Sequence, residues 1–385
     1  MNFAFCLYKF FPYGGLERDF LRIAQACRLR GHTIDIYTIE WEGEVPENLN
    51  LHILPVSHWS NHGRNRGFVK ALAPRLEQGH YDVVVGFNKM PGLDIYYAAD
   101  PCYVAKVRCS RPWYYRLMQR YRHFAAYEEA VFGPASHAEL MMISEVEQGH
   151  FMRYYGTPQE RFHLLPPGIA RDRVAPENAA EIRAEWRREF NVQADEKVIV
   201  MVGSAFKRKG LDRAMRGVAS LPEALRQNTR LFVVGKDNPV FFQRLAEKLG
   251  ISDQVEFFLG RDDVPRFLLG ADIFMHPAYS ENTGTVILEA LVAGLPALVT
   301  DVCGYAFHVT RARAGRVIPS PFRQEDLNHL LLEMLTCPDP AKWSKNGIAY
   351  GMTEDLYSLP DVAADLIEAV GRKKRASFGE HGQSR

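Results

Sequence analysis

Two glutamates separated by seven residues, Glu281 and Glu289, have the spacing that most clearly suggests chemistry in this chain. A short apolar strand precedes them, and a helix is expected over residues 285–293. Gly284 and Thr285 then stand at the helix N-terminus, where unpaired backbone N–H groups favour an anion such as phosphate. We expect the first carboxylate to bind a sugar and the second to bind a ribose. Two surface acids near a helix start are the alternative interpretation.

A basic loop follows the first strand in the second half of the chain. The segment GSAFKRKG, residues 203–210, places Arg208 and Lys209 directly after a strand expected at Lys197–Val202. Because open parallel sheets bind ligands at the carboxyl ends of their strands, two fixed cations there could bind a diphosphate. They would also stabilise the extra negative charge that a leaving diphosphate acquires. A solvated basic turn is the alternative.

The first loop of the chain contains Gly14 and Gly15, and Asp19 lies one turn into the next expected helix. Glycine lets the backbone approach a ligand closely, although an ordinary tight turn explains the pair equally well. The fingerprint G-x-G-x-x-G follows no expected strand, which disfavours a hydride-transferring enzyme. No Asp-x-Asp motif occurs in the sequence. We therefore expect no divalent metal.

Strand and helix patterns alternate in both halves of the chain, which predicts the α/β class with two doubly wound, mostly parallel sheets. Short apolar strands are expected at Phe3–Tyr8, Thr33–Tyr37, Asp82–Gly86, Lys197–Val202, Leu231–Gly235, Val255–Phe258, Ile273–His276 and Ala297–Thr300. A polar linker at 165–176 separates the halves. We expect domains over residues 1–166 and 167–360, followed by a helix and a disordered basic tail over 361–385.

The composition excludes several classes of protein. The chain has 385 residues, of which 47% are hydrophobic and 24% charged, and its net charge is +1. These values favour two globular domains and disfavour a strongly basic nucleic-acid binder. No apolar run approaches the roughly 18 residues that cross a bilayer, and the apolar start does not have the form of a secretory signal. The six cysteines lack zinc-site spacing, so we expect reduced thiols in a cytoplasmic protein.

Together these motifs resemble the retaining family-4 glycosyltransferases, whose GT-B fold pairs two Rossmann-like domains across a cleft. The stretches that carry the resemblance are AFCLYKFFPYGGLERDF, WEGEVP, NHGRN, VVGFNKMPGLDIYYAADPCY, RYRHFAAYE, LPPGI, GSAFKRKG, LFVVGKD, HPAY, LEALVAGLP and VCGYA. Within the family they resemble enzymes that move glucose from UDP-glucose to a heptose of the lipopolysaccharide inner core. The resemblance implies an acceptor-binding N-terminal domain, a nucleotide-sugar-binding C-terminal domain and a peripheral position on the inner face of the bacterial inner membrane.

The resemblance also assigns roles to individual residues. It implies that Glu281 binds hydroxyls of the transferred glucose and that Lys209 acts on the diphosphate, while Asp19 and Asp100 face the sugar or the acceptor; these four are the candidate catalytic residues. The residues implied in donor binding are Gly15, Asp19, Arg173, Arg208, Lys209, Arg261, Glu281, Asn282, Thr283, Gly284, Thr285 and Glu289.

Two departures from the family pattern affect the choice of donor sugar rather than phosphate binding. Ala205 stands where an acid commonly follows Gly-Ser, and Asn282 and Thr283 replace small or aromatic residues. The family's retention of configuration would ordinarily require a carboxylate nucleophile. No clear candidate is present, so we hypothesise a front-face displacement in which the departing phosphate oxygen takes the acceptor proton.

A cationic, aromatic segment spans residues 103–127, with six Lys or Arg residues and no acid. Cations beside interfacial aromatic rings are typical of a segment that lies on an anionic bilayer. The residues expected to face the membrane are Lys106, Arg108, Arg111, Trp113, Tyr114, Tyr115, Arg116 and Arg120. Single-stranded nucleic acid, a phosphorylated acceptor or simple packing as an exposed helix are the alternatives.

The motifs leave other functions open. A related transferase could use another nucleotide sugar, such as UDP-galactose or UDP-N-acetylglucosamine. A non-catalytic, two-lobed small-molecule binding protein would also pair two α/β domains. That second class gives no reason for Glu281 and Glu289 to accompany the cations of the basic loop, so the transferase is the favoured interpretation.

Overall fold

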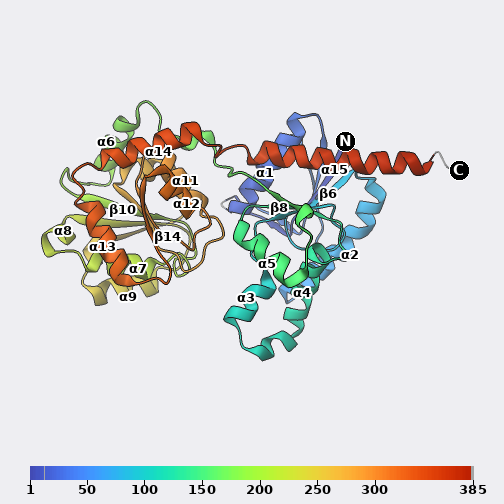
Figure 1. Ribbon diagram of the computed structural model, residues 1–385, viewed down its shortest axis with the longest axis horizontal. Coiled ribbons are helices and arrows are strands. Elements are labelled where there is room, and N and C mark those ends of the chain that lie inside the picture. Colours follow the sequence, from blue (N-terminus) through green and yellow to red (C-terminus); the bar gives the residue numbers. More distant parts are fainter. Residues whose placement is uncertain (13, 383–385) are drawn as a thin grey trace. The chain divides into compact units, whose positions relative to one another are not determined.

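The computed structural model describes residues 1–12 and 14–382, with side chains as far as Ser377, and divides the chain into two units. Unit 1 comprises Met1–Gly168 together with the chain from Ser358 onward, and unit 2 comprises Ile169–Tyr357. Each unit is built around one parallel sheet (Figure 1). The predicted fold class, two doubly wound α/β domains, is confirmed.

Unit 1 contains a seven-stranded parallel sheet in the order β5-β3-β1-β6-β7-β8-β9. Its strands are β1 (Asn2–Cys6), β3 (Thr33–Thr38), β5 (Asn50–Ile53), β6 (Val83–Gly86), β7 (Ile95–Ala98), β8 (Glu139–Met142) and β9 (Phe162–Leu164), and a separate pair is formed by β2 (Lys9–Phe10) and β4 (Glu40–Trp41). Its helices are α1 (Gly15–Leu29), α2 (Asn61–Gly79), α3 (Tyr103–Ser110), the 3₁₀ helix η1 (Trp113–Leu117), α4 (Gln119–Phe132), α5 (Glu145–Tyr155) and α15 (Leu359–Gly382). Because helices cover both faces, the central strands read as continuous apolar runs.

Unit 2 contains a six-stranded parallel sheet in the order β12-β11-β10-β13-β14-β15. Its strands are β10 (Lys197–Val202), β11 (Thr229–Val234), β12 (Val255–Phe258), β13 (Ile273–His276), β14 (Ala297–Thr300) and β15 (Gly315–Ile318). Its helices are α6 (Ala179–Glu189), α7 (Leu211–Ala219), α8 (Glu223–Gln227), α9 (Val240–Leu249), α10 (Val264–Gly270), α11 (Thr285–Val292), α12 (Ala306–Ala312), α13 (Gln324–Leu335) and α14 (Ala341–Thr353). The strand order reverses between β10 and β13, so the loops after these two neighbouring strands meet at one edge.

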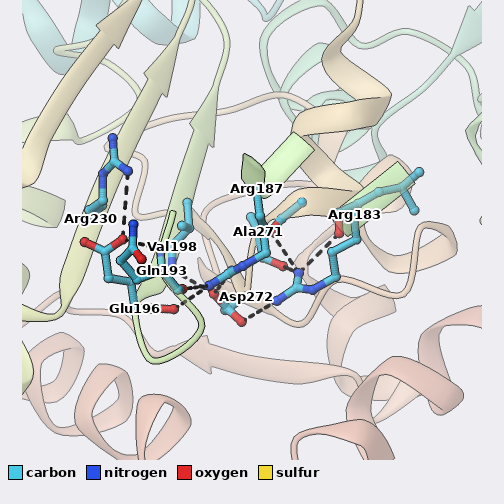
Figure 2. Close-up of polar contacts among 10 residues, drawn as sticks. Arg183, Arg187, Gln193, Glu196, Val198, Arg230, Ala271 and Asp272 are labelled. Atoms are coloured by element: carbon cyan, nitrogen blue, oxygen red, sulfur yellow. Dashed lines mark hydrogen bonds and ion pairs between the residues drawn. The ribbon is translucent and has the colours of Figure 1, made fainter. Parts of the chain in front are cut away.

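The start of the unit 2 sheet is held by a network of charged groups around Asp272 (Figure 2). One carboxylate oxygen of Asp272 accepts from the backbone amide of Val198 at 2.7 Å, and the other from Arg183 at 2.7 Å. Arg187 lies 3.3 Å from the same carboxylate and also donates to the carbonyl of Glu196. These contacts tie α6 to the first residues of β10 and β13. The two strands whose opposite ends carry the candidate site are therefore aligned by one partly buried carboxylate.

For the C-terminal segment, residues 361–385, we expected a helix followed by a disordered basic tail, and the structure describes a helix there. Helix α15 begins at Leu359 and lies on unit 1, where Leu359, Ala363 and Ile367 join the core that contains α1 (Figure 1). Two of its basic residues form ion pairs with unit 1, since Lys374 lies 2.7 Å from Asp94 and Arg375 2.6 Å from Asp82. Apolar burial and these ion pairs keep the segment helical as far as Gly382, and residues 383–385 lie outside the described part of the chain.

A buried carboxylate in unit 1 anchors the segment that was expected to face a membrane. Glu128 of α4 is fully buried, and its Oε1 lies 2.5 Å from the Lys89 ammonium group. It also accepts hydrogen bonds from the backbone amides of Tyr103 and Val104 at the start of α3 and from the Tyr155 hydroxyl. The N-terminus of α3 is thereby attached to α4 at a single acidic group.

Replacing Glu128 by glutamine should destabilise unit 1 because it leaves the Lys89 ammonium group buried without a counter-charge. We expect the free energy of unfolding to fall by about 3 kcal/mol, the usual cost of breaking a buried ion pair from one side. Urea denaturation followed by circular dichroism measures this change. Glu129→Gln, on the exposed face of the same helix, is the matched control and should have little effect. Equal stability of the Glu128 and Glu129 variants would contradict the anchoring role.

Candidate functional site

The predicted acidic and basic motifs of unit 2 meet at one place. Arg208 and Lys209 lie in the loop between β10 and α7, and Glu281 lies between β13 and α11. The guanidinium of Arg208 is 2.9 Å from Oε1 of Glu281, and the ammonium group of Lys209 is 2.8 Å from Oε2. Adjacent parallel strands end at the same sheet edge, which explains why residues 72 and 73 positions apart in sequence form ion pairs.

Burial and charge together set the ionisation of this cluster. The side chains of Glu281 and Lys209 are only 11% and 12% exposed. Burial alone would raise the pKa of Glu281, but a hydrogen bond from His276 and the charges of Lys209 and Arg208 outweigh it and hold the pKa well below the usual range. Glu281 is therefore an ionised, nearly buried acceptor whose two oxygens are oriented by two cations.

His276, the last residue of β13, was not assigned a role from the sequence. It is fully buried, and its Nε2 lies 3.3 Å from Oε2 of Glu281. Burial lowers the pKa of His276 to about 4, so the imidazole is neutral near pH 7 and donates its Nε2 proton to the carboxylate. The signal that could have revealed it is a histidine at the end of a buried strand, five residues before Glu281.

Glycines allow the two loops to pack this closely. Gly203 has φ +120°, and a Cβ on it would lie 2.6 Å from Cε of Lys209, so the lysine side chain lies over the glycine. Gly210 has φ +77°, and a Cβ there would lie 2.0 Å from the carbonyl oxygen of Pro277 in the other loop. Any larger residue at Gly210 would separate the basic loop from the segment that leads to Glu281.

Arg213 is a second residue that the sequence did not point to. Its guanidinium lies 3.5 Å from the centre of the Tyr279 ring and 3.7 Å from that of Phe322. The same group donates to the carbonyl oxygens of Pro277 and Ala278. Arg213 therefore fixes the backbone of the segment that precedes Glu281.

The residues between the two predicted glutamates form the start of α11. Gly284 is the N-cap with φ +84°, and Thr285 is the first helical residue. The backbone of Thr283 accepts from the amide of Tyr305 at 2.8 Å, while Asn282 lies beside it, half-buried. Glu289 lies inside α11 and is 5% exposed. The structure thus places the helix N-terminus directly after the carboxylate of Glu281.

The other two cations predicted for donor binding have local partners. Arg261 binds both oxygens of Asp263, at 2.7 and 2.8 Å. Arg173 lies in a 3₁₀ turn at Arg171–Arg173, 3.4 Å from Asp172. Within the described part of the chain, no ion pair or hydrogen bond joins either arginine to Glu281. Their roles in donor binding stay predictions.

In unit 1 the predicted residues surround the start of α1. Gly14 is the N-cap and Gly15 the first helical residue, and the carboxylate of Asp19 accepts from the Tyr97 hydroxyl at 2.8 Å. Asp100 is exposed in the segment after β7. These positions follow from the β1–α1 and β7–α3 connections, which leave the same edge of the sheet.

Glu17 is a further carboxyl group in this loop that sequence reasoning missed. Its residue surface is 6% exposed, and burial raises its pKa to about 7, with the charges of Asp100 and Asp19 acting in the same direction. A Cβ at Gly14 would lie 1.7 Å from a carboxylate oxygen of Glu17, so that acid folds back over the glycine. Gly14 therefore leaves room for the carboxyl group of Glu17 in this position.

The segment predicted to face a membrane is exposed over most of its length. Trp113, Tyr114, Leu117 and Met118 are between 51% and 69% exposed. The segment α3–η1–α4 projects from the body of unit 1 (Figure 1). Of the eight predicted residues, Lys106, Arg108, Arg111, Trp113, Tyr114, Arg116 and Arg120 are exposed and Tyr115 is half-buried, and their cations have no ion-pair partner among the described side chains.

None of the helices in the described part of the chain combines the length and the apolar character needed to cross a bilayer. No group of three or more His, Cys, Asp or Glu side chains arranged to hold a metal ion was found in the same part of the chain.

Comparison with known proteins gives matches across both units. The model "Glycosyltransferase Family 4" matches residues 13–173, and "Glycosyl transferases group 1" matches residues 182–350. The lipopolysaccharide glucosyltransferase WaaG of Escherichia coli K12 is 48% identical over 368 residues, which cover 95% of this chain and 98% of that protein. A D-inositol 3-phosphate glycosyltransferase of Mycobacteroides abscessus is 30% identical over 60% of this chain and 51% of its own length.

Solved structures agree with these sequence matches. A crystal structure of WaaG superposes with a TM-score of 0.91 at 48% identity, covering 95% of this chain and 99% of that one. Anabaena HepE in complex with UDP-glucose superposes with a TM-score of 0.74 over 96% and 100% of the chains, and at 16% identity it shows the fold alone. The fold and the matches define a glycosyltransferase with the GT-B fold. More narrowly, the chain belongs to the family of the lipopolysaccharide glucosyltransferase WaaG.

Because the imidazole of His276 is neutral in the folded chain, the free energy of unfolding depends on pH. The pKa of His276 is about 4 in the folded chain, whereas an unfolded histidine titrates near 6.5, so unfolding takes up a proton between these values. The stabilisation is complete above about pH 6.5 and is lost as the pH falls toward 4. His276→Gln should reduce the loss of unfolding free energy between about pH 7 and about pH 5 by roughly 2 kcal/mol.

Urea denaturation at the two pH values measures this difference. His329→Gln, which removes an exposed imidazole from α13, should leave the pH dependence as it is in the wild-type chain. If His276→Gln and the wild-type chain lose the same free energy on acidification, the imidazole is not neutral in the folded state.

Proposed function

We propose that this chain transfers glucose from UDP-glucose to a heptose of the lipopolysaccharide inner core with retention of configuration. The observation that carries the proposal is the ion-paired cluster of Glu281, Arg208 and Lys209 at the start of α11. It occurs in a chain that is 48% identical to a lipopolysaccharide glucosyltransferase over almost its whole length. A non-catalytic two-lobed binding protein is not supported, because the family is one of transferases.

Charge explains how the cluster could promote the reaction. Cleavage of the bond between the anomeric carbon and phosphate makes the sugar oxocarbenium-like and the diphosphate more negative. Lys209 has three N–H donors and Arg208 five, so both can hold Glu281 and still donate to phosphate oxygens. Groups already oriented before the reaction stabilise the developing charge without reorganising. The backbone amides of Asn282–Thr285, which lead into the first turn of α11, would add donors on the same side.

The ionised carboxylate of Glu281 is suited to accept hydrogen bonds from sugar hydroxyls, since its pKa is held low and its oxygens are fixed by two cations. We propose that Glu289 binds the ribose, that Gly15 offers its amide to the diphosphate, and that Arg173 and Arg261 complete the donor site. No metal is required in this scheme, because Arg208, Lys209 and the helix N-terminus would supply the positive charge.

For the transfer itself we propose a front-face displacement. The acceptor hydroxyl would attack as the bond to phosphate breaks, and the departing phosphate oxygen would take the proton of that hydroxyl. Asp19 and Asp100 would orient the sugar or acceptor from unit 1. Trapping of a covalent glycosyl-enzyme on Asp19, Asp100 or Glu281 would contradict this mechanism. Mass analysis of protein quenched during turnover is the measurement.

Incubation with UDP-glucose and heptose-terminated lipopolysaccharide tests the overall proposal. The product should gain one hexose by mass. Parallel reactions with UDP-galactose and UDP-N-acetylglucosamine address the donor, which the departures at Ala205, Asn282 and Thr283 leave open. Faster transfer from either of these donors would identify a related transferase instead.

Substitutions in the cluster should separate turnover from nucleotide binding. Glu281→Ala should lower kcat about 100-fold while changing the Kd for UDP less than about threefold, because it removes a contact to sugar. Lys209→Ala should lower kcat to a similar extent and also weaken UDP binding about tenfold, because it removes a contact to phosphate. Steady-state kinetics and calorimetric titration with UDP measure both values.

Lys207→Ala is the matched control, since Lys207 lies in the same loop, is exposed and has no side-chain contact given among the described residues. It should keep kcat within about twofold of the wild type. Wild-type turnover in Glu281→Ala would refute the assigned role.

We propose further that the enzyme works in the cytoplasm on the inner face of the inner membrane, bound by the segment at 103–127. Its exposed Trp113 and Tyr114 would enter the interface while the flanking cations contact anionic headgroups. This position would bring unit 1 to a lipid-anchored acceptor. No nucleic-acid partner is proposed, since a lipid-anchored substrate already accounts for a cationic, aromatic surface.

Neutralising four exposed arginines, as R108Q/R111Q/R116Q/R120Q, should weaken sedimentation with anionic vesicles at low salt by more than tenfold, at roughly 1 kcal/mol for each cation near the surface. Transfer to a short, soluble heptose acceptor should be unchanged. A control that neutralises Arg244 and Lys248, exposed cations of α9, should sediment as the wild type does. Unchanged vesicle binding by the fourfold variant would rule out this surface.

A further inference from the structure

A basic pocket of about 610 Å³ lies on unit 2 between the end of α12, the start of β15 and the length of α14. β15 runs parallel to β14 and, through it, to β13 and β10, so its first residues lie at the sheet edge opposite the loops that carry Arg208 and Glu281. The lining residues and those of the Glu281 cluster have no member in common. The pocket is therefore separate from the candidate donor site.

The lining of the pocket has a strong excess of positive charge. Arg311, Arg313, Arg316 and Lys342 face it, and no carboxylate is among its lining residues. Two of these cations have an acid nearby: Arg316 bonds Glu333 at 3.1 Å, and Arg311 lies 4.0 Å from Glu354. Within the described part of the chain, the side chains of Arg313 and Lys342 form no ion pair or hydrogen bond.

The local backbone does not explain an arginine at position 313. Arg313 ends α12 in the left-handed conformation, with φ 51°, where glycine or asparagine is the less strained choice. Its carbonyl oxygen accepts from the Asn346 side chain at 2.9 Å, which fixes this turn against α14. A long cation is thus held at a position that favours a small residue, next to other cations that repel it. A bound anion would offset that repulsion.

The pocket also offers an aromatic surface beside its cations. Trp343 is half-buried in the first turn of α14, and the guanidinium of Arg316 lies 5.3 Å from its ring centre. Tyr350 also lines the pocket, and its hydroxyl lies 2.6 Å from Nδ1 of His308. A volume of several hundred Å³ suits a small ligand rather than a lone ion. Cations beside an indole can bind a phosphate that is joined to a ring.

We propose that this pocket binds the phosphate group of a phosphorylated sugar, with the phosphate on Arg313 and Lys342 and the sugar ring against Trp343. The inference does not depend on the proposed transferase reaction. The phosphate could belong to a free sugar phosphate or to a glycan head on a membrane lipid, and both present the same chemistry to the pocket.

Titration of the full chain with glucose 6-phosphate, with UDP present in excess to occupy the donor site, tests the proposal. The wild-type protein should show saturable binding with one site per chain by calorimetry. Five tryptophans are present, and the fluorescence change on binding should be lost in Trp343→Phe, because the ring at that position is the one in the pocket. Absence of saturable binding by glucose 6-phosphate and by the vesicles described below would overturn the proposal.

The double variant R313Q/K342Q removes the two cations that lack acidic partners without breaking an ion pair or side-chain hydrogen bond of the described residues. It should weaken glucose 6-phosphate binding at least about tenfold, because charge-assisted bonds to phosphate are lost. R244Q/K248Q makes the same charge change on α9 and should bind as the wild type does. If both double variants weaken glucose 6-phosphate binding equally, the loss reflects the lower net positive charge of the whole protein. That result would contradict a specific binding site in this pocket.

Vesicles with and without phosphatidylinositol 4-phosphate distinguish the two sources of the phosphate. Binding of glucose 6-phosphate that is lost in R313Q/K342Q supports a free sugar phosphate as ligand. Vesicle binding that depends on the phosphorylated lipid and is lost in the same variant supports a lipid headgroup. If R313Q/K342Q behaves as the wild type in both assays, the pocket is not a phosphate site.

Discussion

The candidate site of unit 2 depends on one electrostatic constraint, which is that a nearly buried carboxylate must stay ionised. Glu281 stays ionised because β10 and β13, which are neighbours in the sheet, end at the same edge. The loops that follow them bring Lys209 and Arg208 to the Glu281 carboxylate. His276, at the end of β13, donates a third hydrogen bond to Glu281 while its own imidazole stays neutral. The glycines that let the loops touch, and the arginine that fixes the segment before Glu281, are consequences of the same requirement. A carboxylate and two cations that hold each other in place form a rigid charged group just before the N-terminus of α11.

Three buried or nearly buried acids of this protein have different surroundings and are suited to different roles. Glu281 has two cations and has a lowered pKa. Glu128 has Lys89 and several hydrogen-bond donors, and it organises the start of α3. Glu17 has two other carboxylates as its charged neighbours, and its pKa rises to about 7. The first is suited to accept hydrogen bonds permanently, the second to hold structure, and the third to gain or lose a proton near neutrality.

Much of the fold and part of the site could be predicted from the sequence. Strands with continuous apolar runs, such as β10 and β13, were found because burial on both faces leaves few polar positions. Among the strands that the structure describes, β2, β4, β5, β7, β8, β9 and β15 were missed. The tyrosines of β7 and the three-residue length of β9, for example, give no clear pattern. The meeting of Glu281 with Arg208 and Lys209 followed from topology. The roles of His276 and Arg213 were not predicted, because each depends on contacts that the folded loops create, although the place of His276 at the end of a buried strand was a usable signal.

The path of the chain has a consequence for how the protein is made. Unit 1 includes α15, whose residues Leu359, Ala363 and Ile367 complete a core begun by β1 and α1. The ribosome must therefore synthesise all of Ile169–Tyr357 before the first unit can finish folding, whereas the second unit has its whole sequence available earlier. Until α15 emerges, the apolar face of α1 that it covers is open to water. The unit that begins first in synthesis is thus the last to be completed.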